Sequence, residues 1–272
     1  MQIFGLPLGY LMWAMYQIVH SYGWAIILFT VVTKLLLLPL AIKQQKSTVK
    51  MQIIQPKMQE IQAKYKNNPQ KMNEELQALY ERENYSMTAG CLPMLIQFPI
   101  IFGLLDVIYR PLTHLLHISG EAMTKVTEIA TGLIGTAATS GYAPEIAIMN
   151  SVKANPAAYA ALGTDILGKI QGLDMNFLGL DLSVFPNQVI KFGFSADAMV
   201  TLLNPIILIP LLSGGTALLM SLVTLRNTPS AGNANASMNT MMLMMPLMSL
   251  WFTFMVPAGV GLYWTMSNVV AV

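Results

Sequence analysis

The amino-acid sequence predicts an all-α membrane protein with five transmembrane helices. Its 272 residues are 54% hydrophobic and only 10% charged, whereas a soluble domain usually has about 25% charged residues. Four stretches are apolar for about the 20 residues that a helix needs to cross the hydrocarbon core. The composition excludes a disordered chain, a coiled coil and a nucleic-acid-binding domain, and the single cysteine excludes a disulfide scaffold.

The positions of the charges define the expected spans. Each span contains at most two Asp, Glu, Lys or Arg residues, and the five cover 23–42, 91–117, 201–225, 238–256 and 258–272. The last two come from one uncharged stretch that is too long for a single ordinary span. Pro257, followed by Ala258 and Gly259, predicts the turn that divides it.

A basic segment, 43–90, separates the first two spans and indicates the orientation. It holds eight Lys and Arg residues against five Glu, and positively charged loops stay in the cytoplasm. The loop 226–237 would then be cytoplasmic too, and 118–200 an extracytoplasmic loop with short helices. We expect the N-terminus outside and the C-terminus in the cytoplasm, with Asn68 inside and Gly141 and Pro257 outside.

Two further segments have amphipathic patterns. In 43–90, apolar residues recur at helical spacing on both sides of Asn68-Pro69, which predicts a cytoplasmic helical hairpin. Its charges either solvate a surface or contact anionic lipid head groups or a partner. Residues 1–22 lack Lys and Arg and have one apolar face, which predicts an interfacial amphipathic helix.

Polar side chains recur at one depth of three expected spans. Lys34 is the only charge in its span, with Thr30 one turn away on the same face. Span two contributes Gln97. The last span contributes three more such residues, namely Trp264, Ser267 and Asn268. These side chains either bond neighbouring helices together or line a hydrophilic groove open to the cytoplasm, and the groove accounts better for an unpaired lysine.

The remaining polar residues give no sign of catalysis. Asp106 and Arg110 stand four residues apart and are expected to form a structural pair. His114, His117 and Glu121 would share a helical face, but further metal ligands are lacking nearby. Nucleophile-elbow, zinc-protease and phosphate-loop motifs are absent from the sequence. We expect no catalytic residue, no metal and no cofactor, and hence no enzyme.

Several motifs resemble, in order along the chain, those of the YidC/Oxa/Alb membrane protein insertase family and its bacterial members. Those of the first half are Gly23-Trp24-Ala25-Ile26-Ile27-Leu28-Phe29-Thr30, Leu38-Pro39-Leu40, Lys43-Gln44, Gln55-Pro56-Lys57, Tyr65-Lys66-Asn67-Asn68-Pro69-Gln70-Lys71 and Gly90-Cys91-Leu92-Pro93-Met94-Leu95-Ile96-Gln97-Phe98-Pro99-Ile100. Those of the second half are Phe177-Leu178-Gly179-Leu180-Asp181-Leu182, Pro257-Ala258-Gly259, Gly261-Leu262-Tyr263-Trp264 and Ser267-Asn268.

This resemblance implies a five-helix core around a groove that is open to the cytoplasm and closed outside. It implies nascent membrane proteins as substrates, the Sec translocon and the ribosome as partners, and the bacterial plasma membrane as the location. The family pattern has Arg at the groove position where this sequence has Lys34. A small transporter or channel, or a passive assembly scaffold, remains the alternative.

Overall fold

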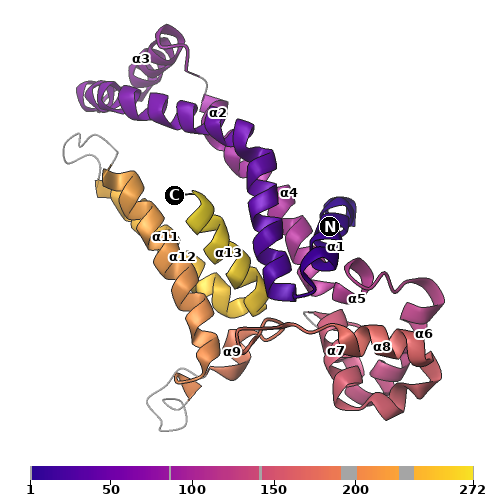
Figure 1. Cartoon of the computed structure of the whole chain (residues 1–272). Coiled ribbons are helices and arrows are strands. Elements are labelled where there is room, and N and C mark those ends of the chain that lie inside the picture. Colours follow the sequence, from indigo (N-terminus) through magenta and orange to yellow (C-terminus); the bar gives the residue numbers. More distant parts are fainter. Residues whose placement is uncertain (1, 86, 141–142, 191–200, 227–235, 272) are drawn as a thin grey trace.

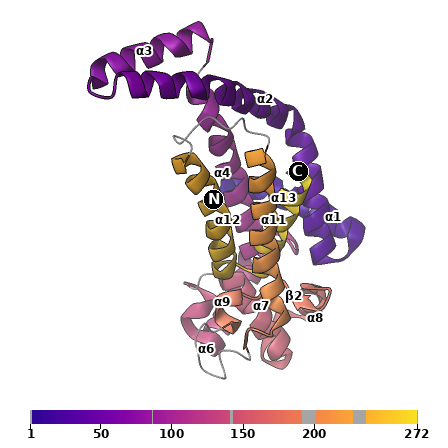
Figure 2. The same ribbon diagram turned by 90° about the vertical axis from the view of Figure 1, so that its left-hand side faces the viewer.

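The computed structural model describes residues 2–85, 87–140, 143–190, 201–226 and 236–271. It is almost entirely helical, and one two-stranded antiparallel sheet is found in this part of the chain. Six helices form its body, namely α1 (Gln2–Val19), α2 (Tyr22–Lys64), α4 (Met87–Tyr109), α11 (Leu208–Arg226), α12 (Ala236–Met255) and α13 (Ala258–Ala271). Figure 2 shows α4, α11, α12 and α13 running between two appendages at opposite ends of the molecule.

Helix α2 is longer than the span that the sequence predicts at 23–42. It continues without interruption to Lys64, so the expected first span and the first half of the hairpin are one helix. Pro39 and Pro56 lie inside it, and a proline removes a backbone hydrogen bond and bends a helix without ending it. Figure 1 shows α2 turning away from the body toward α3.

The first appendage, which we call the arm, comprises residues 43–85. It pairs the second half of α2 with α3 (Pro69–Arg82), where Asn68 caps the helix by accepting a hydrogen bond of 3.1 Å from the Lys71 backbone N–H. The two helices enclose a small apolar cluster of Ile54, Leu79 and Tyr85. A 2.6 Å ion pair from Lys57 to Glu83 adds to it and lowers the pKa of the Glu83 carboxyl.

Two other expected spans differ from the helices in the structure. The span predicted at 91–117 is wrong beyond Tyr109, because α4 ends there and a separate turn, α5 (Pro111–His114), follows. Pro111 has no N–H to continue the helix, and Arg110 before it leaves the helical conformation. The span predicted to begin at residue 201 is preceded in the structure by the short helix η3 (Pro205–Ile207). Helix α11 itself begins only at Leu208.

Two segments of the described chain are long and apolar enough to cross a membrane, namely Tyr22–Ser47 and Pro205–Thr224. Only 28% and 22% of their apolar windows are buried inside the protein. Leu35, Leu36, Leu211 and Leu219 are among the leucines exposed on them. Such bare apolar faces are stable in lipid and unfavourable in water.

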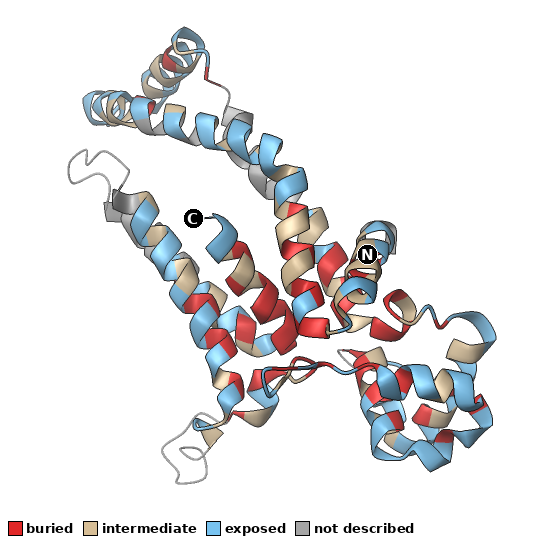
Figure 3. Ribbon diagram, viewed as in Figure 1, coloured by how far each residue is buried: buried red, intermediate tan, exposed pale blue. Residues whose placement is uncertain are grey.

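The second appendage is the 111–190 unit, at the other end of the body. Beyond α5 it contains α6 (Gly120–Ile134), η1 (Gly135–Ala138), α7 (Pro144–Ala154), η2 (Pro156–Leu162), α8 (Thr164–Gly172), β1 (Asn176–Phe177), β2 (Leu180–Asp181) and α9 (Pro186–Val189). Val126, Val152 and Tyr159 are fully buried within it. Figure 3 shows buried residues concentrated along α13 and scattered through this unit, whereas the arm is largely exposed. The described residues of the expected loop 118–200 therefore fold into short helices and one small hairpin.

Candidate functional site

The predicted groove residues lie on helices that meet at α13. This helix packs against α2 on one side and α11 on the other, and α11 packs along α12. In the view of Figure 1, α2 and α11 diverge from the end at which they begin, with α13 between them. The residues that α13 presents to its neighbours, from Ala258 to Tyr263, are all buried.

Lys34 lies half-buried on α2, within the apolar segment Tyr22–Ser47. Within the described residues it has neither a hydrogen bond nor an ion pair. Thr30 is fully buried one turn away, but its hydroxyl donates to the Ile26 carbonyl at 2.7 Å. Thr33 is also buried, and its hydroxyl lies 2.8 Å from the Phe29 carbonyl. Both hydroxyls are satisfied by their own helix, whereas the ammonium group of Lys34 has no partner among the described residues.

The three predicted residues of α13 have different surroundings. Trp264 is half-buried against the main apolar core, and Ser267 is buried. Asn268 faces α11, where its side-chain N–H₂ lies 3.2 Å from the Thr216 hydroxyl and 3.5 Å from the Ser213 carbonyl. For Asn268, the structure therefore supports the alternative interpretation, hydrogen bonding between helices. Gln97 is on α4, and its side chain is outside the described residues.

A chain of hydroxyl groups on α11 and α12 extends this contact. It was not predicted from the sequence. The Ser213 hydroxyl of α11 lies 3.2 Å from that of Ser249 and 3.0 Å from that of Thr253, both on α12. Ser213 and Thr253 are completely buried. Together with Asn268, these groups tie α11, α12 and α13 together in an otherwise apolar region. The spacing of Ser249 and Thr253 by four residues is the only sequence signal for it, and serine or threonine often bonds its own helix instead.

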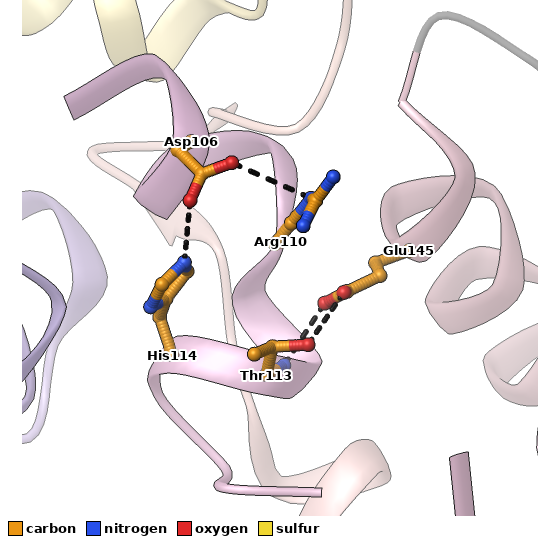
Figure 4. A network of polar contacts seen from close by, with 5 residues as sticks. All are labelled: Asp106, Arg110, Thr113, His114 and Glu145. Atoms are coloured by element: carbon orange, nitrogen blue, oxygen red, sulfur yellow. Dashed lines mark hydrogen bonds and ion pairs between the residues drawn. The ribbon is translucent and has the colours of Figure 1, made fainter. Parts of the chain in front are cut away.

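A second buried polar network lies where α4 meets the 111–190 unit (Figure 4). Asp106 pairs with Arg110 at 3.5 Å, as the sequence predicts, and its other oxygen lies 3.1 Å from Nε2 of His114. Gly5 and Gly9 of α1 lie so close to Asp106 and His114 that neither could carry a side chain in this arrangement. The network therefore fixes α1, α4 and α5 together.

The neighbouring Glu145 of α7 holds α5 from the other side. Its carboxylate accepts hydrogen bonds from the Thr113 backbone N–H at 2.9 Å and from the Thr113 hydroxyl at 2.6 Å. Burial raises the pKa of this carboxyl, although the hydrogen bonds from Thr113 oppose the shift. The contact holds α5 against α7 within the 111–190 unit and is structural.

The expected common face of His114, His117 and Glu121 is wrong, because no single helix contains them. Helix α5 ends at His114, and His117 has a φ of +53°. The His117 ring packs against Tyr10 and Trp13 of α1, with centroids 5.5 and 5.3 Å apart, whereas Glu121 pairs with Lys125. The described chain contains no cluster of three or more side chains suited to a metal ion.

Comparison with known proteins assigns the family. The family model described as "60Kd inner membrane protein" matches residues 14–272. The chain belongs to this family. The match confirms the resemblance to the YidC/Oxa/Alb proteins and covers all of the described helices except the first part of α1.

Relatives of known name agree with this family assignment. A membrane protein insertase YidC of Treponema denticola is 27% identical over 96% of this chain and 35% of its own length. Another, of Clostridium tetani, is 41% identical over 45% of this chain and 54% of its own length. A third, of Endomicrobium trichonymphae, is 43% identical over 32% of this chain and 17% of its own length. The chain thus spans between about a sixth and a half of the relatives' lengths in these matches.

Proposed function

We propose that the chain is a membrane protein insertase. It would receive the hydrophilic part of a nascent membrane protein in a polar groove and release the apolar segment into the bilayer. The observation that carries the proposal is the family match over residues 14–272, together with relatives named as insertases. The half-buried Lys34, without a partner among the described residues, supports a hydrated site between helices.

The proposed architecture has five spanning helices, which are α2, α4, α11, α12 and α13. Helices α4 and α12 contain shorter apolar stretches, Phe98–Tyr109 and Pro246–Met255, beside the two longer segments. The groove would lie between α2 and α11 with α13 as its base, because α13 packs against both. It would open toward the arm, where α2 and α11 diverge (Figure 1).

The chemistry of such a site is solvation, without bond making or breaking. A charged segment crossing hydrocarbon costs several kcal/mol per charge, and a water-filled groove shortens the distance over which that cost applies. The ammonium group of Lys34 would attract acidic segments of the substrate. Insertion would then proceed as the apolar segment moves from the groove into lipid.

We further propose the partners and location that the family resemblance implies. The substrates would be nascent membrane proteins, delivered by ribosomes and in part together with the Sec translocon. The basic arm would face the cytoplasm, near anionic lipid head groups. The membrane would be the bacterial plasma membrane, in accordance with a family of inner membrane proteins.

Reconstitution of the purified chain in liposomes tests the proposal. A single-span client with a short acidic tail, synthesised outside the vesicles, should become protected from added protease only in vesicles that contain the chain. Empty vesicles and vesicles with an unrelated polytopic protein are the controls. Ion flux without client insertion would instead indicate a channel or transporter, and client binding without protection would indicate a passive scaffold.

A further inference from the structure

The 176–184 segment connects the starting ends of three helices of the body. The Phe177 ring packs directly on Gly23 at the start of α2 and meets the Trp24 ring edge-on, with centroids 5.5 Å apart. Two backbone N–H groups at the start of α13 donate to this segment, that of Ala258 to the Val184 carbonyl and that of Gly259 to the Leu182 carbonyl, both at 2.9 Å.

The same segment reaches the start of α11. Gly179, Leu180 and Asp181 line a cavity of about 190 Å³ together with Asn204, Pro205 and Ile206. The two longest apolar segments begin at Tyr22 and at Pro205. Because the β1–β2 hairpin contacts both starting points, its turn lies at the level where these segments enter the bilayer.

The turn itself contains a strained and exposed leucine. Leu178 and Gly179 join β1 to β2 with φ values of +51° and +80°, as in a type I′ turn. Asparagine or glycine normally occupies the first of these positions, and a bulky residue there is strained. The Leu178 side chain is nevertheless 83% exposed. In water neither the strain nor the exposed apolar surface would be compensated.

Other exposed apolar residues lie beside the cavity and along α11. Leu203, adjacent to the cavity residue Asn204, is 82% exposed, and Leu208 and Leu211 follow it along the helix. Trp24, beside Phe177 on α2, is also exposed, and tryptophan favours the interface between head groups and hydrocarbon. Lipid would cover these exposed residues of α2 and α11 in a chain whose two long apolar segments span the membrane.

We propose that Leu178 and Leu203 insert into the bilayer interface and anchor the 176–184 segment to lipid. The partner is the lipid surface itself, recognised through its hydrocarbon. The contact would hold the starting ends of α2, α11 and α13 at a fixed depth in the bilayer. This inference requires only that α2 and α11 span the membrane, so it stands or falls separately from the insertase activity.

Spin-label depth measurements test the anchor. The full chain, with Cys91→Ser, would carry a nitroxide at Leu178→Cys or Leu203→Cys in vesicles of uncharged phosphatidylcholine. Leu133→Cys, an exposed leucine on α6 of the 111–190 unit, is the control, and Leu211→Cys on α11 is the lipid-facing reference. We expect labels at 178 and 203 to lose access to a water-soluble nickel chelate relative to 133 while oxygen still reaches them, as at 211.

Two results would overturn the anchor. Access of the nickel chelate to position 178 equal to that at 133 would place the turn in water. An immobile label reached by neither reagent would mean that protein covers the turn, either a second copy or a client.

A second variant provides a further check. Leu178→Asn removes the apolar side chain, and asparagine adopts the positive φ of this turn readily, so the fold should be preserved. The nitroxide at position 203 should then lie less deep in the bilayer. An unchanged depth at 203 would contradict an anchoring role for Leu178.

Discussion

Lys34 stands out at the scale of single residues. A lysine at the centre of a spanning helix costs about 2.5 to 3.5 kcal/mol on insertion scales, and within the described chain no carboxylate offsets that cost. The hydroxyls of Thr30 and Thr33 are committed to backbone carbonyls of α2. Water in the proposed groove is therefore the natural partner of the ammonium group, and an acidic segment of a client could replace it.

We predict that the charge of Lys34, rather than its size, determines how acidic clients are received. Lys34→Arg should retain insertion of a client with an acidic tail, because the positive charge is kept. Lys34→Glu should reduce it about tenfold or more, which corresponds to about 1.4 kcal/mol of lost attraction. Lys34→Ala should fall between them. The measurement is the protease-protected fraction of the client in the liposome assay, at equal amounts of reconstituted protein.

A change in the client provides the control for the Lys34 prediction. If the contact is direct, Lys34→Glu should regain part of its activity with a client whose acidic tail residues are replaced by lysine. A client with a neutral tail should respond weakly to all three substitutions. Equal insertion of the acidic client by Lys34→Glu and by the unaltered chain would refute a charge role and leave only the polarity of the groove.

At the scale of elements, α2 combines two environments in one helix. It packs against α1, α4 and α13 of the body, and in its second half it pairs with α3 around the small cluster of Ile54, Leu79 and Tyr85. Helical continuity alone gives little protection against local opening, since most helical stability in proteins comes from packing. We therefore expect the arm to open more easily than the body.

We predict that backbone hydrogen exchange increases along α2 from the body into the arm. Residues 43–64 and α3 should exchange much faster than α13, where residues Ala258 to Tyr263 are buried without interruption. Exchange followed by mass spectrometry in lipid nanodiscs would measure this, with α13 as the internal reference. Lys57→Ala, which removes the ion pair to Glu83, should accelerate exchange in α3 and leave α13 unchanged. Equal protection of the arm and α13 would show that the arm packs as a rigid part of the body.

Some elements were predictable from the sequence because local chemistry determines them. Pro257 ends α12 and precedes α13, Asn68 and Pro69 start α3, and the spacing of Asp106 and Arg110 gives their ion pair. The continuity of α2 was not predictable, because hydropathy reports the surroundings of a helix and not whether it is interrupted. The contact of His114 with Asp106 was missed for another reason, since it requires the chain to turn at Pro111.

The candidate site shows the same division. Sequence indicates that Lys34 is a costly charge, and the structure leaves it half-buried. The partners of Asn268 depend on which side of α13 meets α11, which no pattern within 258–272 specifies. The role of the 176–184 segment was also hidden, because its contacts join positions of the chain far apart in sequence.

At the scale of the whole molecule, the charges are separated between its two ends. The arm carries most of the Lys and Arg residues of the sequence, and the 111–190 unit has more Asp and Glu than Lys. Figures 1 and 2 place these two appendages at opposite ends of the body. Such a distribution favours one orientation in the membrane, with the basic end in the cytoplasm.

We predict that the arm is cytoplasmic and the 111–190 unit lies outside. Gly141 is outside the described residues and Pro257 is buried, so exposed positions are better reporters, Gln70→Cys on α3 and Glu121→Cys on α6, each with Cys91→Ser. A membrane-impermeant thiol reagent added to spheroplasts should label position 121 and spare position 70, whereas detergent should make both reactive. This orientation is expected because segment 43–90 has eight Lys and Arg residues. In the opposite orientation all eight would have to cross the bilayer. Labelling of position 70 before detergent is added would reverse the topology, and the proposed groove would then open away from the ribosome.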